Sequence, residues 1–487
     1  MSQPIDRRRW LKAAAALAVT GTSAGCANVA NLANTATPLT GGLPARGEFL
    51  IRGANIISMD TQIGDFAQGD VHVRNGTIIN VAANIPAPNS TNATVINANG
   101  MICMPGFIDT HWHLWTSVAR SIIRIDNPKL GYFPVTNALG PHYAPEDGYN
   151  GVRLGMAEAL SAGITTVHNW AHNIRSPEHA DAELRAMRDM GLRGRLAYGT
   201  PQGWPGDKPM DLDGLARVQR AWTSGAANDG LLTLGISSRN IGDSTNALRG
   251  NISIDMAQID WGGARTLGLP ITMHTSGASP IKLMDEAKLL GPDVQLVHPL
   301  LTTAEERQIM AKRGVSYSMS PVGESRRPAS AGVIQLGELL TAGVKCSLST
   351  DHSTTFNADF FQCMRLLYNL HQHRMGDKVP VTAKRMVQLA TIDGAVDLGI
   401  AQQTGSLTPG KRADIILVRT TDINMAPYNN DPYETLVSFA QPRNVDTVMV
   451  DGRILRRGGE FTALNHVEVV KRAAESAAAL LTRAGWK

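Results

Sequence analysis

The feature that most constrains the fold is a repeated alternation of short apolar runs and longer helical stretches, which begins near residue 105. Each run is rich in aliphatic and β-branched residues and ends in polar side chains. Uninterrupted apolar runs of this length are typical of parallel strands that are buried on both faces. The alternation with helices therefore indicates a series of βαβ units.

Eight runs occur within the roughly 300 residues that follow, which suits the size of a (β/α)8 TIM barrel. We predict strands over 106–111, 164–168, 195–199, 232–237, 271–274, 295–298, 315–318 and 345–349. We predict helices between them over 151–162, 179–190, 213–221, 253–267, 280–290, 304–312 and 333–342. Residues 105–404 are therefore interpreted as the barrel of an α/β protein.

Two β-rich flanks stand outside this alternation. Residues 47–104 contain an Asn75-Gly76 pair between alternating residues, which is a strong hairpin signal. Residues 405–465 contain two further strand-like runs, ADIILVR and VDTVMVDGRILRRG. We expect the flanks to pair into one small β-sandwich domain that is discontinuous in sequence, and residues 466–487 to form a C-terminal amphipathic helix.

The first 26 residues have the layout of a signal peptide, with a basic segment, a short apolar run and small residues. Arg7 and Arg8 lie in DRRRWLK, which resembles the twin-arginine export motif, and Cys26 closes a segment that resembles a lipobox. The alternative is an ordinary amphipathic N-terminal helix. We expect export to the periplasm by the twin-arginine machinery, with Cys26 as a candidate lipid anchor and residues 27–46 as a linker.

Composition excludes several other classes of protein. Apolar residues make up 43% of the chain and charged residues 18%, so the chain as a whole is not disordered. The formal net charge is only +4, and the basic N-terminal segment contributes most of it, which argues against nucleic acid or an anionic membrane surface as a partner. The four cysteines lack zinc-finger spacing. A small molecule is the expected partner, and the sequence leaves a homo-oligomer open.

Histidines and a carboxylate mark the ends of four predicted strands. His111 and His113 close the first run, and alternate residues of a strand point to the same side. His274, His298 and Asp351 end or follow the fifth, sixth and eighth runs. Because the carboxyl ends of barrel strands meet at the mouth where active sites lie, we expect these groups to converge. Imidazoles and a carboxylate suit a divalent cation such as Zn²⁺ or Fe²⁺.

With these residues, the chain resembles the amidohydrolase superfamily of metal-dependent hydrolases, in the branch that includes cytosine deaminase and the triazine hydrolases. The resemblance covers about residues 48–460 and rests on PGFIDTHWH, the strand-end His274 and His298, STD at 349–351, LATIDGAVDLGI, TGSLTPGKRADIILV and VDTVMVDGRIL. It implies that His111, His113, His274 and Asp351 bind one catalytic metal ion, with Zn²⁺ as the expected ion. It further implies that His298 lies beside the substrate or the water that the metal activates.

Two departures from the family's pattern bear on the chemistry. Binuclear members use a carboxylated lysine from the fourth strand, whereas the fourth run, LLTLGISSRN, contains no lysine, so we predict a mononuclear site. The deaminases of this branch carry a glutamate three residues after the fifth-strand histidine, and this chain has Gly277 there. Simple deamination of an aminopurine or of cytosine is therefore less expected than hydrolysis of an amide-type bond.

A mechanism follows from the groups that remain. A divalent cation lowers the pKa of its water toward neutrality and polarises the carbon under attack. Asp351 is the predicted proton carrier, which takes a proton from that water and returns it to the leaving nitrogen. His298 is predicted to orient the nucleophile or to stabilise the developing oxyanion. The alternative for His298 is a purely structural histidine with one hydrogen-bond partner.

Aromatic and imidazole side chains near the predicted strand ends are candidates for contact with a planar or aromatic substrate. Indole rings can stack on a flat substrate, although large aromatic residues more often pack in a core. The candidates are Trp112, Trp115, His168, Trp170, His172 and Trp204.

Three functions are consistent with the sequence. The first is hydrolysis of a non-peptide C–N bond in an amide, urea, carbamate or cyclic amide by a metal-activated water. The second is deamination or dechlorination of a nitrogen heterocycle, in which His298 substitutes for the absent glutamate. The third is a non-catalytic lipoprotein that binds a ligand at the barrel mouth. Metal content, together with the release of ammonia or an amine, would distinguish them.

Overall fold

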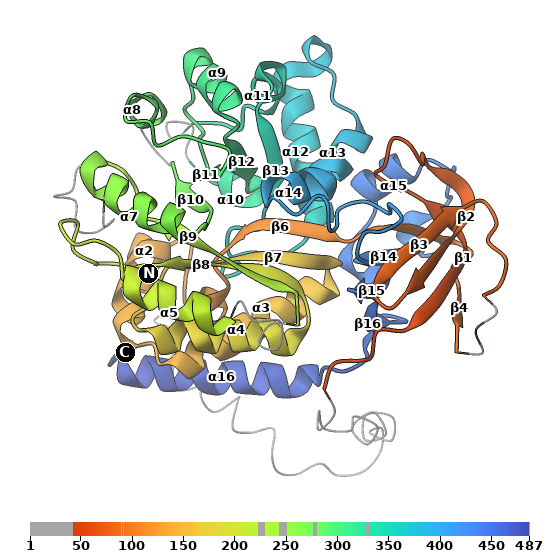
Figure 1. Cartoon of the computed structure of the whole chain (residues 1–487), viewed down its shortest axis with the longest axis horizontal. Helices are drawn as coiled ribbons and strands as arrows, with labels where there is room; N and C mark the ends of the chain where they lie inside the picture. Colours follow the sequence, from red (N-terminus) through yellow and green to blue (C-terminus); the bar gives the residue numbers. More distant parts are fainter. Residues whose placement is uncertain are drawn as a thin grey trace, which may run out of the picture. The chain divides into compact units, whose positions relative to one another are not determined.

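Eight parallel strands form a barrel, and each coincides with one of the predicted runs to within a few residues (Figure 1). The strands are β6 (Phe107–Trp112), β7 (Ile164–Ala171), β8 (Arg193–Gly199), β9 (Leu232–Ser238), β10 (Ile271–His274), β11 (Val294–Val297), β12 (Ser316–Met319) and β13 (Lys345–Leu348). Neighbours are parallel from β6 through to β13. A bridge between Trp112 and Asp351 joins the first strand to the segment after the last. The predicted (β/α)8 fold is confirmed.

The computed structural model describes residues 42–88, 90, 92–222, 229–242, 251–275, 280–327 and 332–486. The predicted signal peptide, Cys26, the linker up to residue 41 and Gly277 lie outside the described residues. Within these ranges, no helix is both long enough and apolar enough to cross a membrane.

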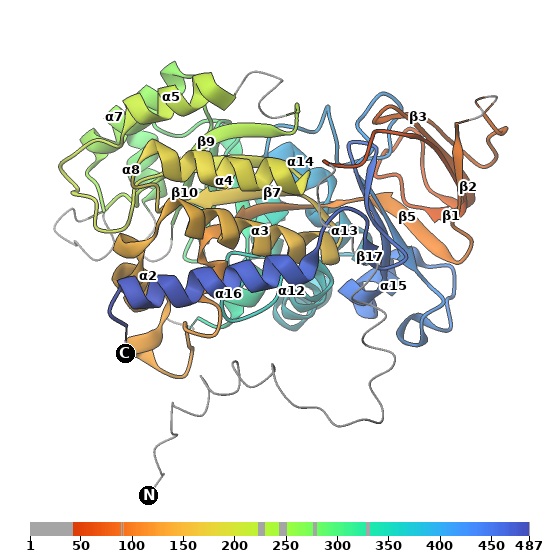
Figure 2. The same ribbon diagram turned by 90° about the horizontal axis from the view of Figure 1, so that it is seen from below.

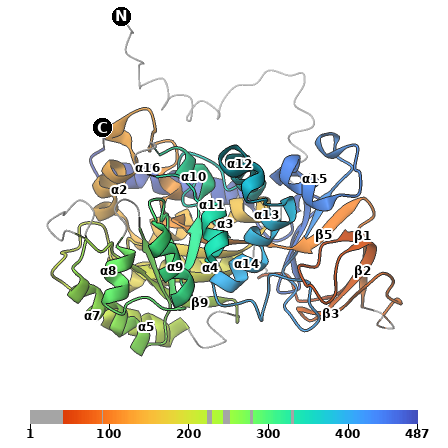
Figure 3. The same cartoon turned by 90° about the horizontal axis from the view of Figure 1, so that it is seen from above.

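Helices follow the strands and cover the outside of the barrel (Figure 3). Those between strands are α2 (Tyr132–Leu139), α3 (Pro145–Ser161), α4 (Pro177–Met190), α5 (Leu212–Trp222), α7 (Ile254–Thr266), α8 (Ile281–Glu286), α9 (Ala304–Arg313), α10 (Pro321–Ser325) and α11 (Leu336–Ala342). Those after the last strand are α12 (Phe360–Met375), α13 (Ala383–Ala390), α14 (Ile392–Asp397), α15 (Pro432–Ser438) and α16 (His466–Arg483). Short 3-10 helices span Leu114–Ala119, Pro128–Leu130, Gly140–His142, Gly376–Lys378, Ile423–Met425 and Pro442–Asn444.

Local sequence explains where these helices begin and end, as α9 illustrates. The Thr303 hydroxyl accepts a hydrogen bond from the Glu306 amide over 3.2 Å, and the Glu306 carboxylate accepts one from the Thr303 amide over 2.8 Å. This reciprocal pair satisfies two amides that the first turn of a helix leaves unpaired. Gly314 ends the helix with φ of +74°, a conformation that glycine adopts without strain.

The two flanks form one β-rich domain at one end of the barrel (Figures 1 and 3). Its strands are β1 (Glu48–Ile56), β2 (Phe66–Arg74), β3 (Thr77–Ala82), β4 (Thr94–Asn97), β5 (Met101–Pro105), β14 (Ile415–Arg419), β15 (Val445–Val450), β16 (Arg453–Arg457) and β17 (Glu460–Phe461). The N-terminal and C-terminal halves meet where β5 pairs antiparallel with β14. Hydrogen bonds join all nine strands into one continuous sheet. Some of its buried side chains form an apolar cluster of their own, and others, such as Ile416 and Val448, join the barrel core.

Two details of this domain follow from its sequence. Asn75 and Gly76 have φ of +49° and +84° and form the tight turn between β2 and β3, as the Asn-Gly pair predicts. Arg193 on β8 donates to Asp414 over 2.7 Å, and both side chains are buried. Asp414 also accepts from the Asp451 amide over 2.7 Å, so one charged contact ties the barrel to the β-rich domain.

The C-terminal helix α16 packs along α3 on the outside of the barrel (Figure 2). Its buried residues Ala473 and Leu480 join a small apolar cluster with Trp115 and Leu139. The main core is a larger cluster formed by the barrel strands and the helices around them. The strands are therefore held rigidly, and their carboxyl ends are fixed in space for the residues that follow.

Candidate functional site

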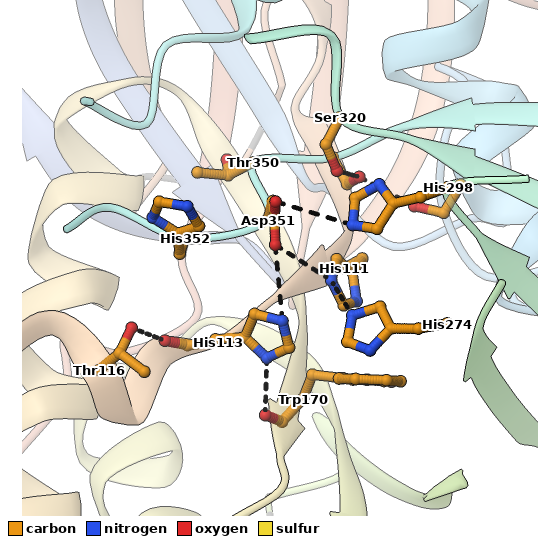
Figure 4. A network of polar contacts seen from close by, with 12 residues as sticks. His111, His113, Thr116, Trp170, His274, His298, Ser320, Thr350, Asp351 and His352 are labelled. Carbon is orange, nitrogen blue, oxygen red and sulfur yellow. Dashed lines mark hydrogen bonds and ion pairs between the residues drawn. The ribbon is translucent and has the colours of Figure 1, made fainter. Parts of the chain in front are cut away.

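Five predicted site residues lie together at the carboxyl ends of the barrel strands (Figure 4). His111 lies near the end of β6 and His274 ends β10. His113 directly follows β6 and His298 directly follows β11. Asp351 lies just beyond the end of β13. Since parallel strands deliver their carboxyl ends to one edge, residues from four strands meet at one point.

Backbone geometry fixes the residues from the first and last strands against each other. The His113 amide donates to the Asp351 carbonyl oxygen over 2.7 Å, and the Asp351 amide donates to the His111 carbonyl oxygen over 2.8 Å. Asp351 and His298 have φ of +71° and +60°. This left-handed conformation is uncommon for residues other than glycine, and strained residues of this kind concentrate at functional sites.

The side chains of these residues converge on one small space. Nε2 of His111 lies 3.3 Å from Nε2 of His274. Oδ1 of Asp351 lies 3.5 Å from Nε2 of His111 and 3.5 Å from Nε2 of His113. Within the described residues, the ligand atoms of His111, His113 and His274 lie within 4.8 Å of one another, as do those of His111, His298 and Asp351. Imidazole nitrogens that face each other beside a carboxylate are a donor set that fits one divalent cation.

Burial sets the protonation of this cluster. It lowers the pKa of His111 to about 4, and burial and neighbouring imidazoles hold the pKa values of His113 and His274 well below their usual range. A neutral imidazole is the form that binds a metal. Burial raises the pKa of Asp351, but His298 and His111 outweigh it and hold that pKa well below its ordinary value. The cluster therefore presents neutral nitrogens and one anionic carboxylate.

His298 lies between two carboxylates. Its Nδ1 is 2.8 Å from Oε1 of Glu324, and its Nε2 is 3.7 Å from Oδ2 of Asp351. The side chains of His298 and Glu324 are 2% and 0% exposed. Burial and Arg327 lower the pKa of His298, yet the two carboxylates raise it more, so it lies above its ordinary value.

A pocket of about 420 Å³ opens at this end of the barrel, and His113, His274, His298 and Asp351 are part of its lining. The apolar part of its wall contains Ile123, Ile125, Tyr132, Phe133 and Phe356. A pocket with an apolar wall and a few converging polar groups is typical of a small-molecule site.

Arginines dominate the charge of the pocket wall. Four of them line it, and Asp351 is the one carboxylate among the described lining residues; the arginines are Arg124, Arg239, Arg326 and Arg327. Arg239 is buried and pairs with Asp260 over 2.7 Å, whereas Arg124 pairs with Asp126 at the exposed rim. Arg326 donates to the Thr355 carbonyl oxygen over 3.2 Å, and its guanidinium lies 4.9 Å from the centre of the Phe356 ring.

The structure brings only two of the six predicted substrate contacts to the pocket, namely Trp170 and His172. Trp112 is fully buried in the barrel core, and Trp115 packs near α16, with its indole N–H 3.3 Å from Nδ1 of His172. His168 lines a different cavity, beside Arg195 and Asp397. Trp204 donates to the Pro209 carbonyl oxygen and does not line the pocket. The structure gives these four residues no route to a substrate in this pocket.

Two residues that the sequence analysis did not single out lie at the site. Glu324 reaches His298 from α10, a helix of only five residues that no periodicity reveals. Tyr132 begins α2, and its ring centre lies 5.8 Å from that of His113. Its hydroxyl is buried and has no hydrogen-bond partner among the described residues. The sequence marks each of them only as a polar residue in a segment that follows a predicted strand.

Comparison with known proteins places the chain among metal-dependent hydrolases. A model of the amidohydrolase family matches residues 102–236 and 267–455. A 5'-deoxyadenosine deaminase of Methanothermobacter thermautotrophicus is 29% identical over 448 residues, which cover 89% of this chain and 98% of that protein. A 5-methylthioadenosine/S-adenosylhomocysteine deaminase of Moorella thermoacetica is 27% identical over 442 residues, which cover 87% and 97%.

Solved structures with the same fold include two that hold zinc. An adenosine deaminase from Xanthomonas campestris with bound zinc has a TM-score of 0.77 at 21% identity, and the match covers 90% of this chain and all of that one. An atrazine chlorohydrolase from Arthrobacter aurescens, complexed with zinc, has a TM-score of 0.74 at 19% identity and covers 88% of this chain. These two likenesses support the barrel and its attached β-rich domain.

Proposed function

Because the chain belongs to the amidohydrolase family, we propose that it hydrolyses a carbon–nitrogen bond, other than a peptide bond, in a small molecule. The observation that carries this proposal is the convergence of three histidines and Asp351 at the floor of the pocket. His111, His113, His274 and Asp351 would hold one divalent ion, and zinc suits this set of nitrogen and oxygen ligands. β9 contains no lysine that could bridge a second ion, which supports one ion per chain.

The chain's own residues supply the proton chemistry. A zinc ion in such a site acts as a Lewis acid and makes water a nucleophile near neutral pH. Asp351 lies within reach of the ligand nitrogens and of His298, and it carries the proton from the nucleophile to the leaving nitrogen. Nε2 of His298 faces the same space and orients the nucleophile by accepting a hydrogen bond from it.

The nature of the bond separates two versions of this function. The first is hydrolysis of an amide, urea, carbamate or cyclic amide, which needs no group beyond the residues named above. The second is deamination of an amino-substituted heterocycle, which the names of the deaminase relatives favour. Gly277 stands where the resemblance places a glutamate, so deamination would rely on His298 instead.

The pocket's lining indicates the character of the substrate. Its aromatic part, with Tyr132, Phe356 and Trp170, suits a planar group. Asp260 and Asp126 neutralise two of the wall arginines, Arg239 and Arg124. Arg326 has no carboxylate partner among the described residues, and a cation in the wall favours a substrate that carries a negatively charged substituent. Arg326, held over Phe356, is the arginine we assign to this contact.

The test is a substrate screen on zinc-loaded protein that lacks residues 1–26. The panel contains amides, ureas, carbamates and cyclic amides, together with aminopurine nucleosides and chlorotriazines, each with and without a carboxylate. Release of amine, ammonia or chloride identifies the reaction, and the Asp351→Asn variant is the control for contaminating hydrolases. No hydrolysis of any member by protein with full zinc content would contradict the proposal.

We further propose that the chain is exported to the periplasm through the twin-arginine pathway. The pair Arg7 and Arg8, followed by the apolar run and small residues up to Cys26, supports this proposal. A metalloenzyme that acquires its ion before export must cross the membrane folded, which that pathway allows. Lipidation of Cys26 would then hold the enzyme at the membrane surface.

A further inference from the structure

The contact between His298 and Glu324 lies next to the proposed metal ligands. His298 lines the pocket, and Glu324 is not part of the lining. Oε1 of Glu324 is 2.8 Å from Nδ1 of His298, a normal length for a hydrogen bond. Nε2, on the other side of the ring, is 3.7 Å from Oδ2 of Asp351, which is too long for a direct hydrogen bond. The ring therefore has one firm partner, and that partner is Glu324.

The carboxylate of Glu324 determines which ring nitrogen of His298 carries the hydrogen. An ionised carboxylate only accepts hydrogen bonds, so the atom that faces it at 2.8 Å must carry the hydrogen. In a neutral imidazole the other nitrogen then has a free lone pair, and the hydrogen bond made by one nitrogen determines the state of the other. Nε2 of His298 is thus the atom left to act on the contents of the pocket, which His298 lines.

Glu324 is itself held in place. The Tyr317 hydroxyl donates to its carboxylate over 3.3 Å, and burial together with Glu324 raises the pKa of Tyr317 well above its ordinary value, so this hydroxyl keeps its proton. The Glu324 amide donates to the Ser320 carbonyl oxygen over 2.9 Å, which fixes the short helix α10. The ring of His298 also lies parallel to that of His274, with the two ring centres 5.5 Å apart.

We propose that Glu324 is a positioning residue that keeps the hydrogen of His298 on Nδ1 and turns Nε2 toward the reacting groups. This inference rests on the proposed function, because it assigns Nε2 of His298 to the nucleophile, from which it accepts a hydrogen bond. Loss of Glu324 frees the ring to change tautomer and orientation. Removal of a carboxylate that orients a site histidine typically costs about 10–100-fold in activity. The loss is expected in kcat, with KM changed little, since Glu324 touches no substrate.

The first test reads the tautomer directly. Zinc-loaded protein with ¹⁵N-labelled histidine is studied by long-range ¹H–¹⁵N correlation, and the His298 signals are assigned by their absence in His298→Asn. At a pH above the pKa of His298, the expected pattern has a protonated Nδ1 and an unprotonated Nε2. Glu324→Leu should convert it into a mixture of both tautomers, whereas Tyr317→Phe, which removes a hydrogen bond to Glu324 but keeps the carboxylate, should leave it unchanged. A native protein with its hydrogen on Nε2 overturns the proposal.

The second test separates positioning from a merely structural role. If Glu324 only anchored α10, its replacement would lower the melting temperature of the protein. The tautomer of His298, kcat and KM would then stay unchanged. Glu338→Gln, at a partly exposed ion pair with Arg374, is the matched control and should change neither the tautomer of His298 nor kcat.

If Glu324→Leu does not fold, Glu324→Gln gives the same comparison, because it removes the charge at nearly constant size. A wild-type chain with zinc but without hydrolase activity contradicts the proposed function, while an unaltered tautomer in both variants contradicts the positioning role alone.

Discussion

The Asp351 amide donates a hydrogen bond to the carbonyl oxygen of His111 over 2.8 Å. This contact links the first barrel strand to the segment after the eighth, so the site itself closes the barrel. The carboxylate of Asp351 and the imidazole of His111 are therefore held against each other by main-chain hydrogen bonds at the strand ends. Sites built on strands in this way are more precise than sites on loops alone.

Replacement of Asp351 by asparagine should separate proton transfer from metal binding. The amide oxygen still reaches the position of the carboxylate, so we expect zinc affinity to fall modestly. Turnover should fall by roughly 10²–10⁴, the scale for loss of a general acid–base group. Elemental analysis beside steady-state kinetics checks both values. Near-native turnover with full zinc occupancy would exclude Asp351 as the proton carrier.

Histidine variants should divide into two groups by metal content. His113→Ala and His274→Ala each remove one proposed ligand, so both zinc and turnover should be lost. His298→Asn should retain one zinc per chain but lose activity by roughly 10²–10⁴, the scale for loss of a side chain that acts on a transferred proton. His373→Gln, at an exposed position on α12, is the control. Two zinc ions per native chain would contradict the mononuclear assignment.

Arg326→Gln should weaken binding of anionic substrates selectively. A carboxylate that pairs with the guanidinium loses a charge-assisted hydrogen bond, which is worth about 1.5–3 kcal/mol, so KM should rise by roughly 10–100-fold. The neutral analogue of the same substrate should be turned over with unchanged KM. Arg313→Gln, on α9 and outside the pocket lining, should affect neither substrate. Equal effects of Arg326→Gln on the charged and neutral substrates would disprove the anion preference.

Glu183→Gln should alter the pH dependence of stability. Glu183 is buried on α4 and accepts from Asn169 over 2.7 Å, and burial raises its pKa to about 8. Because this folded-state pKa lies above the unfolded value, the folded chain binds the proton more tightly, and stability falls as pH rises from about 4.5 to 8. The loss is of the order of a few kcal/mol, at about 1.4 kcal/mol per pKa unit.

The glutamine variant cannot ionise, so its melting temperature should exceed that of the wild type at pH 9 and match it closely at pH 5. Differential scanning calorimetry at both values measures the difference. Glu146→Gln, at an exposed position on α3, should show no such trend. If the melting temperatures of Glu183→Gln and of the wild type fell equally as pH rises, the Glu183 carboxyl would not control the pH dependence of stability.

Export can be tested in cells that express the full chain. Replacement of Arg7 and Arg8 by lysine should retain the precursor in the cytoplasm, as judged by fractionation and immunoblotting. Cys26→Ser should leave export intact and release the mature chain from the membrane fraction if Cys26 carries a lipid. Unimpeded export of the double lysine variant would contradict the twin-arginine assignment.

Much of the site could be predicted because its residues follow local rules. The strand period of two places His111 and His113 on one side, and by the same rule it turns Trp112 toward the core, where the structure has it. Trp112, a predicted substrate contact, is therefore not part of the pocket lining. His274, His298 and Asp351 were recognisable because each stands at the end of an apolar run, and a barrel gathers such ends at one mouth.

The sequence by itself determined the order of strands and helices, the pairing of the two β-rich flanks and the group of strand-end ligands, because periodicity and turn chemistry act between near neighbours. The tertiary structure decided which of the remaining polar residues face that group. Glu324 reaches His298 only because α10 follows β12 at the same end of the barrel where β11 ends, and Arg326 lines the pocket where Thr355 and Phe356 hold its guanidinium. These contacts join segments that are distant along the chain, so no local pattern specifies them, and the packed barrel alone brings them together.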